Sequence, residues 1–337
     1  MGNPRFVIYG AGAVGGGLGA LLTRAGHEVV LIARGPHLDA LRSGGLRLIT
    51  PEGAETIPVT AVASPRELSL SADDVVFLTM KSNDTEPALS ELEAVADPDT
   101  ALVCAQNGVA NERAALRRFS NVYGMWTMFP VVHLEPGVVQ LRSRPVPAVL
   151  DIGRYPGGVD ESAETIAAAI ESAGCRSVPR PDIMRWKYAK LLRNLVNAVD
   201  AIAEPGPTAT EIIDRLRVEG QQVLDAAGIE YTGDEEQQLR VGEFLRQTDP
   251  VEGAGIAGSS SWQSVARGTG RIESDYLNGE IALLGRLHGV PAPVNEFVRR
   301  TANAHVRAGR PPNSLSGKDL RAGYEAARRG STLRPER

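Results

Sequence analysis

The sequence predicts an α/β protein with an N-terminal Rossmann-type, doubly wound parallel sheet and a C-terminal all-helical domain. Three observations predict this fold. First, a glycine-rich turn separates two β-like runs at 6–9 and 28–33. Second, further apolar runs alternate with helical patterns beyond this turn. Third, the pattern after Pro181 is almost wholly helical. We expect two domains, 1–182 and 183–337, since single cores rarely grow beyond about 250–300 residues.

The first element expected is a strand over 6–9, followed by a turn over 10–19 and a helix over 18–25 that Gly26 ends. The next run, 28–33, is apolar on both faces, as parallel strands usually are. Strands at 75–79 and 101–104 then alternate with helices at 85–95 and from about 110. This alternation predicts βαβ units and a parallel sheet.

The sequence pattern changes between about 121 and 153, where short β-like runs are separated by proline and glycine. We expect the pieces at 131–132, 138–141 and 148–152 to extend or edge the sheet. Beyond Pro181, helical stretches are expected at 182–203, 208–227, 234–247 and 275–288. These stretches form the expected second domain.

The composition, with 42% hydrophobic and 23% charged residues, is that of an ordinary globular chain and excludes wholesale disorder and a membrane protein. Two cysteines cannot form a disulfide framework, which favours a reducing, cytoplasmic location. The histidines are scattered, so no metal site is expected. The apolar stretch 6–22 contains six glycines and lacks a basic leader, so neither a signal peptide nor a membrane partner is expected.

The formal net charge of −5 gives no reason to expect a nucleic-acid partner. Positive charge gathers only in the C-terminal tail, 307–337, with eight basic and three acidic residues. A solvated helix with a frayed end explains this tail most simply, and an arm that binds phosphate or a partner is the alternative.

The glycine-rich turn carries a GxGxxG pattern between a strand and a helix. There, glycines permit the tight turn and let backbone N–H groups and the helix dipole approach a pyrophosphate. A turn that binds nothing is the alternative. The residues expected to hold the dinucleotide are Gly10, Gly12, Ala13, Val14 and Gly15.

The end of the second strand indicates which dinucleotide binds. An NAD enzyme normally has an acidic residue there for the ribose hydroxyls, whereas this chain has Ala33-Arg34-Gly35. Because Arg34 can pair with a 2′-phosphate, NADPH/NADP+ is the expected cofactor. An exposed loop arginine is the alternative. Two further polar residues, Lys81 and Asn107, follow later strands and should face the same crevice, since ligands bind beyond the carboxyl ends of parallel strands.

Two segments of the expected helical domain carry polar residues suited to a substrate. At 100° per residue, Lys190, Asn194 and Asn197 fall within about 60° on one helix, and such a stripe is costly to bury without a partner. A solvated helix face is the alternative. The segment 259–279 adds a run of serines and Glu273, although serines also cap helices and a glutamate also suits a first helical turn.

Taken together, the chain resembles the ketopantoate reductase family over most of residues 5–300. The stretches that carry the resemblance are GAGAVGGGLGALLTRAGHEVVLIARG (10–35), FLTMKSNDTEPAL (77–89), AQNGVANE (105–112), KLLRNLVNAVDAI (190–202) and SSSWQSVARGTGRIESDYLNGEIALLGRLHGVPAPVN (259–295). The resemblance implies NADPH-dependent reduction of 2-dehydropantoate to pantoate, a step of pantothenate biosynthesis, and a homodimer formed through the helical domain.

By the same resemblance, Lys190 is the general acid, Glu273 its acidic companion, and Asn194 and Asn197 are substrate-binding amides. The substrate-binding serine falls on Ser260, with Ser261 as the competing alignment. Three departures from the family pattern concern the site: Asn197 follows Asn194 by three residues instead of four, the spacing from serine to glutamate is one longer, and Asp200 adds a carboxylate. Two alternatives therefore stay open. One is a reductase of another 2-oxo acid, carbonyl or imine; the other is a non-catalytic NADP(H)-binding sensor.

Overall fold

The computed structural model describes residues 4–242, 244–248 and 258–332. Their contacts divide them into two compact units. The first, here called the sheet unit, comprises the described residues within Met1–Lys187 and Thr232–Ile256; the second, the helical unit, comprises those within Tyr188–Tyr231 and Ala257–Arg337. The predicted domain boundary at 182/183 stays a prediction.

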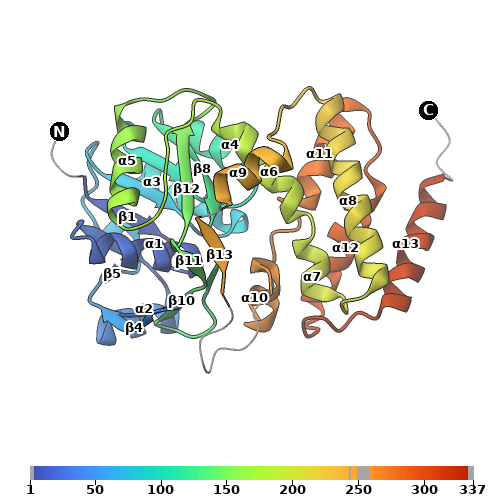
Figure 1. Ribbon diagram of the computed structural model, residues 1–337, viewed down its shortest axis with the longest axis horizontal. Helices are drawn as coiled ribbons and strands as arrows, with labels where there is room; N and C mark the ends of the chain where they lie inside the picture. The colour runs from blue at the N-terminus through green and yellow to red at the C-terminus, as the bar shows by residue number, and fades with distance from the viewer. Residues whose placement is uncertain (1–3, 243, 249–257, 333–337) are drawn as a thin grey trace. The chain divides into compact units, whose positions relative to one another are not determined.

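A seven-stranded sheet forms the centre of the sheet unit (Figure 1). Its strand order is β12-β8-β7-β6-β1-β2-β5, and every neighbouring pair is parallel except β12 with β8. The predicted doubly wound sheet is thereby confirmed. The strands are β1 (Phe6–Tyr9), β2 (Val29–Ile32), β5 (Thr60–Val62), β6 (Val75–Leu78), β7 (Ala101–Cys104), β8 (Val122–Met128) and β12 (Val149–Arg154).

The strand order reverses beside β1. The chain passes from β1 outward to β2 and β5, and then returns to the other side of β1 to form β6. Loops at such a reversal separate to opposite faces of the sheet and leave a crevice where ligands bind in α/β proteins. A ligand site is therefore expected at the loops after β1 and β6.

Helices cover both faces of this sheet, because its strands are apolar on both sides. Phe6 and Ile8 belong to one core cluster with residues of α1 (Ala13–Arg24) and α5 (Glu161–Ser172). Val7 and Tyr9 belong to a second cluster with residues of α3 (Thr85–Glu93) and α4 (Asn111–Leu116). Side chains alternate between faces along a strand, so one short run supplies both cores.

Smaller elements complete the sheet unit. Four strands form a second sheet in the order β4-β3-β10-β9, so the expected pieces at 131–132 and 138–141 belong to it and not to the main sheet, whose edge is β12. Its strands are β3 (Leu46–Thr50), β4 (Gly53–Ile57), β9 (Val131–Val132) and β10 (Val138–Leu141); α2 (Gly35–Gly44) and the 3₁₀ turns η1 (Pro65–Glu67) and η2 (Ser82–Asp84) lie in the connections.

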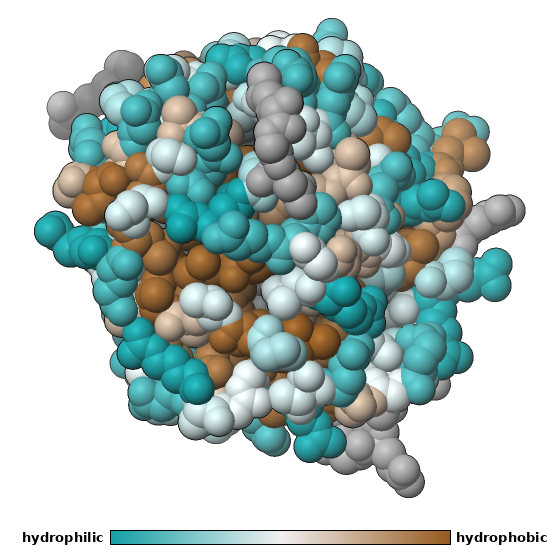
Figure 2. All heavy atoms as spheres, turned by 90° about the vertical axis from the view of Figure 1, so that its left-hand side faces the viewer, coloured by the Kyte–Doolittle hydropathy of each residue, from teal (hydrophilic) through white to brown (hydrophobic). Residues whose placement is uncertain are grey.

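The sheet unit's surface mixes polar and apolar residues. Figure 2 shows one of its faces, where an apolar area is surrounded by hydrophilic side chains. More than half of a folded protein's accessible surface is apolar, so this mixture is ordinary. No helix within the described ranges is long and apolar enough to cross a bilayer.

The helical unit consists mainly of helices, as predicted (Figure 1). Its first helix, α6, begins in the sheet unit and ends in the helical unit, because the division between the units falls after Lys187. The helices are α6 (Ile183–Asn194), α7 (Asn197–Ile202), α8 (Pro207–Ala226), α10 (Ser260–Ala266), α11 (Asn278–His288), α12 (Pro293–Arg307) and α13 (Gly317–Thr332).

Two predicted helices are wrong in part. The stretch 182–203 is interrupted between α6 and α7, and 234–247 is α9 (Asp234–Val241) followed by the strand β13 (Leu245–Gln247). That strand pairs with β11 (Ser143–Pro145) of the sheet unit. Arg240 also bonds the buried Asp151 of β12 at 2.7 and 2.9 Å. Distant partners, which a local pattern does not reveal, determine this segment's conformation.

Candidate functional site

The glycine-rich turn links β1 to α1, and two of its glycines are required by packing. Gly10 has φ +106°, and a Cβ there would lie 2.7 Å from the backbone nitrogen of Met80. A Cβ on Gly15 would meet the Gly10 carbonyl oxygen and the Thr79 hydroxyl. These two glycines let the turn pack closely against the end of β6.

Gly12 has a different role, because a Cβ there would meet nothing within 4 Å. It is the N-cap of α1, and no side chain caps that helix end. Gly12, Ala13 and Val14 are half-buried, whereas the rest of the helix up to Leu22 is buried. N–H groups without a side-chain cap at the positive end of a helix, beside a glycine whose missing side chain leaves space, suit a pyrophosphate.

Arg34 follows β2 and is the N-cap residue of α2, and 64% of its side chain is exposed. Its Nη2 lies 3.4 Å from the Tyr9 hydroxyl and 3.5 Å from Glu91 Oε1. Tyr9 donates a 2.5 Å hydrogen bond to Glu91 Oε2. Burial, together with that hydrogen bond, raises the pKa of Tyr9 well above its usual range. Sequence reasoning missed Glu91, which lies on α3, 57 residues after Arg34.

The loops that carry Lys81 and Asn107 are joined by buried hydrogen bonds. Gln106 donates to Thr85 Oγ1 at 2.7 Å, and Thr85 donates to Asn111 Oδ1 at 2.8 Å. Asn111 in turn donates to the carbonyl of Asn107 at 3.2 Å. This network connects the start of α3, shortly after Lys81, with the loop after β7. Because β6 and β7 are adjacent parallel strands, Lys81 and Asn107 lie at the carboxyl ends of neighbouring strands.

Lys187 lies beneath the loop after β7 and is 3% exposed. Its ammonium pairs with Glu112 of α4, which is fully buried, and donates to the carbonyls of Cys104 and Gln106 at 3.1 Å each. An ammonium has three hydrogens, and these three acceptors account for all of them. Lys187 therefore has no hydrogen left for a substrate. Burial raises the pKa of the neighbouring Cys104 thiol well above its usual range, as for a core residue.

The predicted polar stripe is shorter than expected. Lys190 and Asn194 lie in the last turns of α6 and are half-buried, whereas Asn197 is the first residue of α7. The angular argument that placed all three on one helix face therefore holds only for Lys190 and Asn194. Among the described residues, none accepts a hydrogen bond from the buried Nδ2 of Asn194. Leaving a buried donor without an acceptor costs stability, which indicates a ligand contact at this amide.

The junction between α6 and α7 is held by residues that sequence reasoning left without a role. Asn278, fully buried at the start of α11, donates to the carbonyl of Leu195 at 3.1 Å and to Asn295 Oδ1 at 3.1 Å. Asn295 donates in turn to the buried carboxylate of Glu219 at 2.9 Å, and burial raises the pKa of Glu219. The Leu195 carbonyl, which has no partner within a helix because α6 ends there, is thus hydrogen-bonded by Asn278.

The structure explains the departure at Asp200. Its Oδ2 accepts a 2.8 Å hydrogen bond from the Ser259 backbone N–H, so the carboxylate holds the start of α10. Ser259 caps α10, because its hydroxyl accepts from the N–H of Trp262 at 3.2 Å. The next two serines differ in exposure: Ser261 is 1% exposed, whereas Ser260 is half-buried. The choice of Ser260 over Ser261 stays a prediction.

Glu273 lies in the turn before α11 and is 4% exposed. Its carbonyl accepts from the N–H groups of Tyr276 and Leu277 at 2.9 and 3.0 Å. The helix after it begins at Asn278 and not at 275, so Glu273 does not sit in a first helical turn. That interpretation, which needs no ligand, is therefore wrong for this residue.

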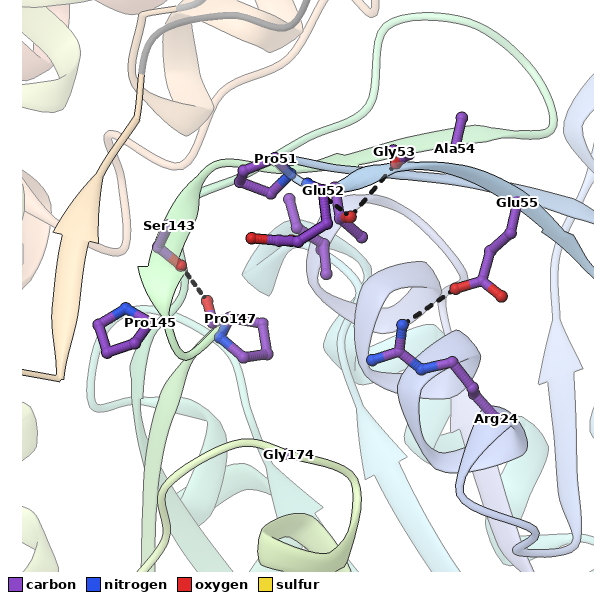
Figure 3. Close-up of a pocket in the computed structure, with 12 residues that line it drawn as sticks. Arg24, Pro51, Glu52, Gly53, Ala54, Glu55, Ser143, Pro145, Pro147 and Gly174 are labelled. Carbon is purple, nitrogen blue, oxygen red and sulfur yellow. Dashed lines mark hydrogen bonds and ion pairs between the residues drawn. The ribbon is translucent and has the colours of Figure 1, made fainter.

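A cavity of about 490 Å³ lies elsewhere in the sheet unit (Figure 3). It is lined by the turn between β3 and β4, by prolines near β11 and by the Arg24–Glu55 ion pair, 3.0 Å long. None of the predicted site residues lines it. Within the described ranges, no group of three histidine, cysteine or acidic side chains could hold a metal ion.

A glycine-rich helix start at the switch point of a doubly wound sheet is typical of a dinucleotide-dependent oxidoreductase, and the helical unit adds a lysine and a buried amide that has no acceptor among the described residues. Two family models match this chain: "Ketopantoate reductase PanE/ApbA" over residues 6–157 and its C-terminal counterpart over residues 182–306. The chain belongs to the ketopantoate reductase family, whose members are NAD(P)H-dependent enzymes.

Relatives support this membership. A 2-dehydropantoate 2-reductase of Pyrococcus horikoshii is 31% identical over 299 residues, which cover 86% of this chain and 94% of the relative. One from Archaeoglobus fulgidus is 31% identical over 300 residues, with the same coverage. The crystal structure of a PanE/ApbA family ketopantoate reductase from Ralstonia eutropha JMP134 superimposes with a TM-score of 0.75 at 28% identity, covering 90% of this chain and 99% of that one.

Proposed function

We propose that the protein reduces a 2-oxo acid with NADPH, and that this substrate is 2-dehydropantoate, the precursor of pantoate in pantothenate biosynthesis. The observation that carries the proposal is the end of α6, where Lys190 lies one turn before Asn194, whose buried amide nitrogen finds no acceptor in the part of the chain that the structure describes. Relatives named 2-dehydropantoate 2-reductase over nearly their whole length support the choice of substrate.

Residues of the sheet unit would hold the dinucleotide. The uncapped start of α1 at Gly12, Ala13 and Val14 would receive the pyrophosphate, and Arg34 the 2′-phosphate. Lys81 and Asn107 would contribute from the loops after β6 and β7. When bound, the dinucleotide supplies the hydride.

Residues of the helical unit would act on the substrate. Hydride addition leaves negative charge on the carbonyl oxygen, and the Lys190 ammonium would neutralise that charge and donate its proton to the oxygen, giving the alcohol. Asn194 would donate a hydrogen bond from Nδ2 to the substrate. Ser260 and Asn197 would bind the remaining polar groups, and Glu273 would orient the ammonium.

The proposed function is tested by following NADPH oxidation by the purified chain across a panel of 2-oxo acids that includes ketopantoate. We expect ketopantoate to give the highest kcat/KM of the panel. A markedly higher value for another 2-oxo acid would establish the alternative reductase. Tight NADP+ binding without turnover of any member would instead indicate a sensor.

Removing the Arg34 side chain should lower the preference for NADPH. A charge-assisted hydrogen bond contributes about 1.5–3 kcal/mol, so Arg34→Ala should weaken NADP+ binding about ten- to hundredfold and leave NAD+ binding nearly unchanged. Isothermal titration with both dinucleotides measures the effect. Arg24→Ala is the matched control, because it removes the same charge from the last turn of α1, where Arg24 pairs with Glu55. Equal losses for both dinucleotides would contradict the assignment.

A further inference from the structure

We propose that Glu91 is a specificity-determining residue of the dinucleotide site: its carboxylate competes with a 2′-phosphate for Arg34 and so limits the preference for NADPH over NADH. The inference rests on the proposed function only in assigning the 2′-phosphate to Arg34. It concerns a residue that lies outside the glycine turn and outside the β2 terminus.

The Glu91 carboxylate is held in place by a residue other than Arg34. It lies in the last turn of α3, and its Oε2 accepts the 2.5 Å hydrogen bond from Tyr9, the last residue of β1. Tyr9 is 3% exposed, so its ring is anchored in the core. The carboxylate is thus fixed at the carboxyl end of β1, where the strand order reverses.

The contact with Arg34, by contrast, is loose. Glu91 Oε1 lies 3.5 Å from Arg34 Nη2, and the two side chains are 33% and 64% exposed. An exposed pair of this kind changes an equilibrium constant by no more than about fivefold. A dianionic phosphate makes shorter, charge-assisted bonds with a guanidinium. A bound 2′-phosphate can therefore displace Glu91 from Arg34. The Arg34–Glu91 ion pair is then lost, and the phosphate and the carboxylate repel each other.

The end of β2 lacks the acidic residue that is typical of NAD enzymes. In those enzymes a carboxylate at the end of the second strand accepts hydrogen bonds from the ribose hydroxyls. Here Ala33 and Arg34 follow that strand, and the carboxylate beside Arg34 comes from α3 instead. One site thus contains a cation suited to the 2′-phosphate and an anion that disfavours it.

Replacing Glu91 by glutamine tests the competition. We expect Glu91→Gln to raise the affinity of the full chain for 2′,5′-ADP about three- to tenfold at 0.15 M salt, from the lost ion pair and the lost repulsion. The affinity for 5′-AMP should stay within about twofold of wild type, since an unmodified ribose does not compete for Arg34. Isothermal titration measures both ligands without any substrate.

Two variants separate competition from a general effect of charge. Glu93→Gln is the matched control: Glu93 lies on the same helix, but it pairs with Arg118 at 3.2 Å. In an Arg34→Ala background the gain from Glu91→Gln should shrink at least about twofold, because the competition for Arg34 is gone and only the repulsion between the two anions is left to relieve.

An equal gain with Glu93→Gln, an equal gain for 5′-AMP, or no gain for 2′,5′-ADP would each overturn the inference. These outcomes do not depend on the proposed reaction. A chain that fails to reduce ketopantoate but shows the selective gain refutes the function and keeps the role of Glu91. If Arg34→Ala leaves 2′,5′-ADP binding unchanged, the 2′-phosphate assignment and the inference fail together.

Discussion

Replacing Lys190 by alanine is expected to lower kcat for ketopantoate reduction by about 10²–10⁴, because a positioned acid typically contributes that much to the rate. The proposed acid acts on charge that develops only as the hydride arrives, so NADPH affinity should hardly change. Steady-state kinetics together with dinucleotide titration of the same variant measure both quantities.

Two other variants make the Lys190 result specific. Lys318→Ala, which removes an exposed lysine on α13, should leave kcat unchanged. Asn194→Ala should chiefly raise the KM, since an amide that binds substrate and transition state equally does not alter kcat. If Lys190→Ala retains more than about a tenth of the wild-type kcat, against the loss expected from general acid catalysis, Lys190 is not the acid. Lys81 would then be the next candidate, because the hydrogens of Lys187 are already accepted by Glu112 and two carbonyls.

Lys187→Met is expected to reduce the free energy of unfolding by about 3–5 kcal/mol, because it leaves the Glu112 carboxylate buried and unpaired. The midpoint of thermal unfolding should fall by roughly 10 °C, at about 2–4 °C per kcal/mol for a unit of this size. Intrinsic fluorescence can follow the transition, since Trp126 and Trp186 belong to one core cluster and Trp186 precedes Lys187 in α6.

The double variant Lys187→Met/Glu112→Leu decides whether the loss comes from the ion pair. Removing both charges of a buried pair is often neutral, so the double variant should recover most of the lost stability. Lys318→Met is the control for a lysine in solvent and should change stability by less than about 0.5 kcal/mol. A double variant as unstable as Lys187→Met would show that the unpaired carboxylate is not the cause, and that the loss comes from the packing of the methionine or from the two carbonyls that lose their donor.

Sequence reasoning reached the architecture because the evidence for it is local. Short apolar runs, a glycine turn and capping patterns are each contained within a few residues, and the sheet and most of the helices follow from them. The break between α6 and α7 could not be predicted in this way. Leu195 and Val196 suit a helix, and the carbonyl that the break releases is bound by Asn278, 83 residues later in the chain.

The same distinction separates the predicted site residues from the missed ones. The glycine turn, Arg34, and Lys190 with Asn194 occur in recognisable local patterns. Glu91 and Glu112 resemble ordinary helical glutamates, and only the fold brings them to Arg34 and Lys187. Asp200, which looks out of place near a carboxylate substrate, is explained once its bond to the Ser259 N–H is known.

The continuity of α6 restricts how this region can change during evolution. Lys187 is fixed in the core of the sheet unit, and Lys190 follows three residues later on the same uninterrupted helix. Inserting or deleting one residue between them would rotate Lys190 by about 100° around the helix axis and shift it by about 1.5 Å along it. Because Lys190 is the proposed acid, substitutions on the exposed side of this helix should be tolerated, whereas a residue inserted or deleted between the two lysines should not. Length variation among relatives should therefore accumulate in the connections between helices and leave the spacing of these two lysines intact.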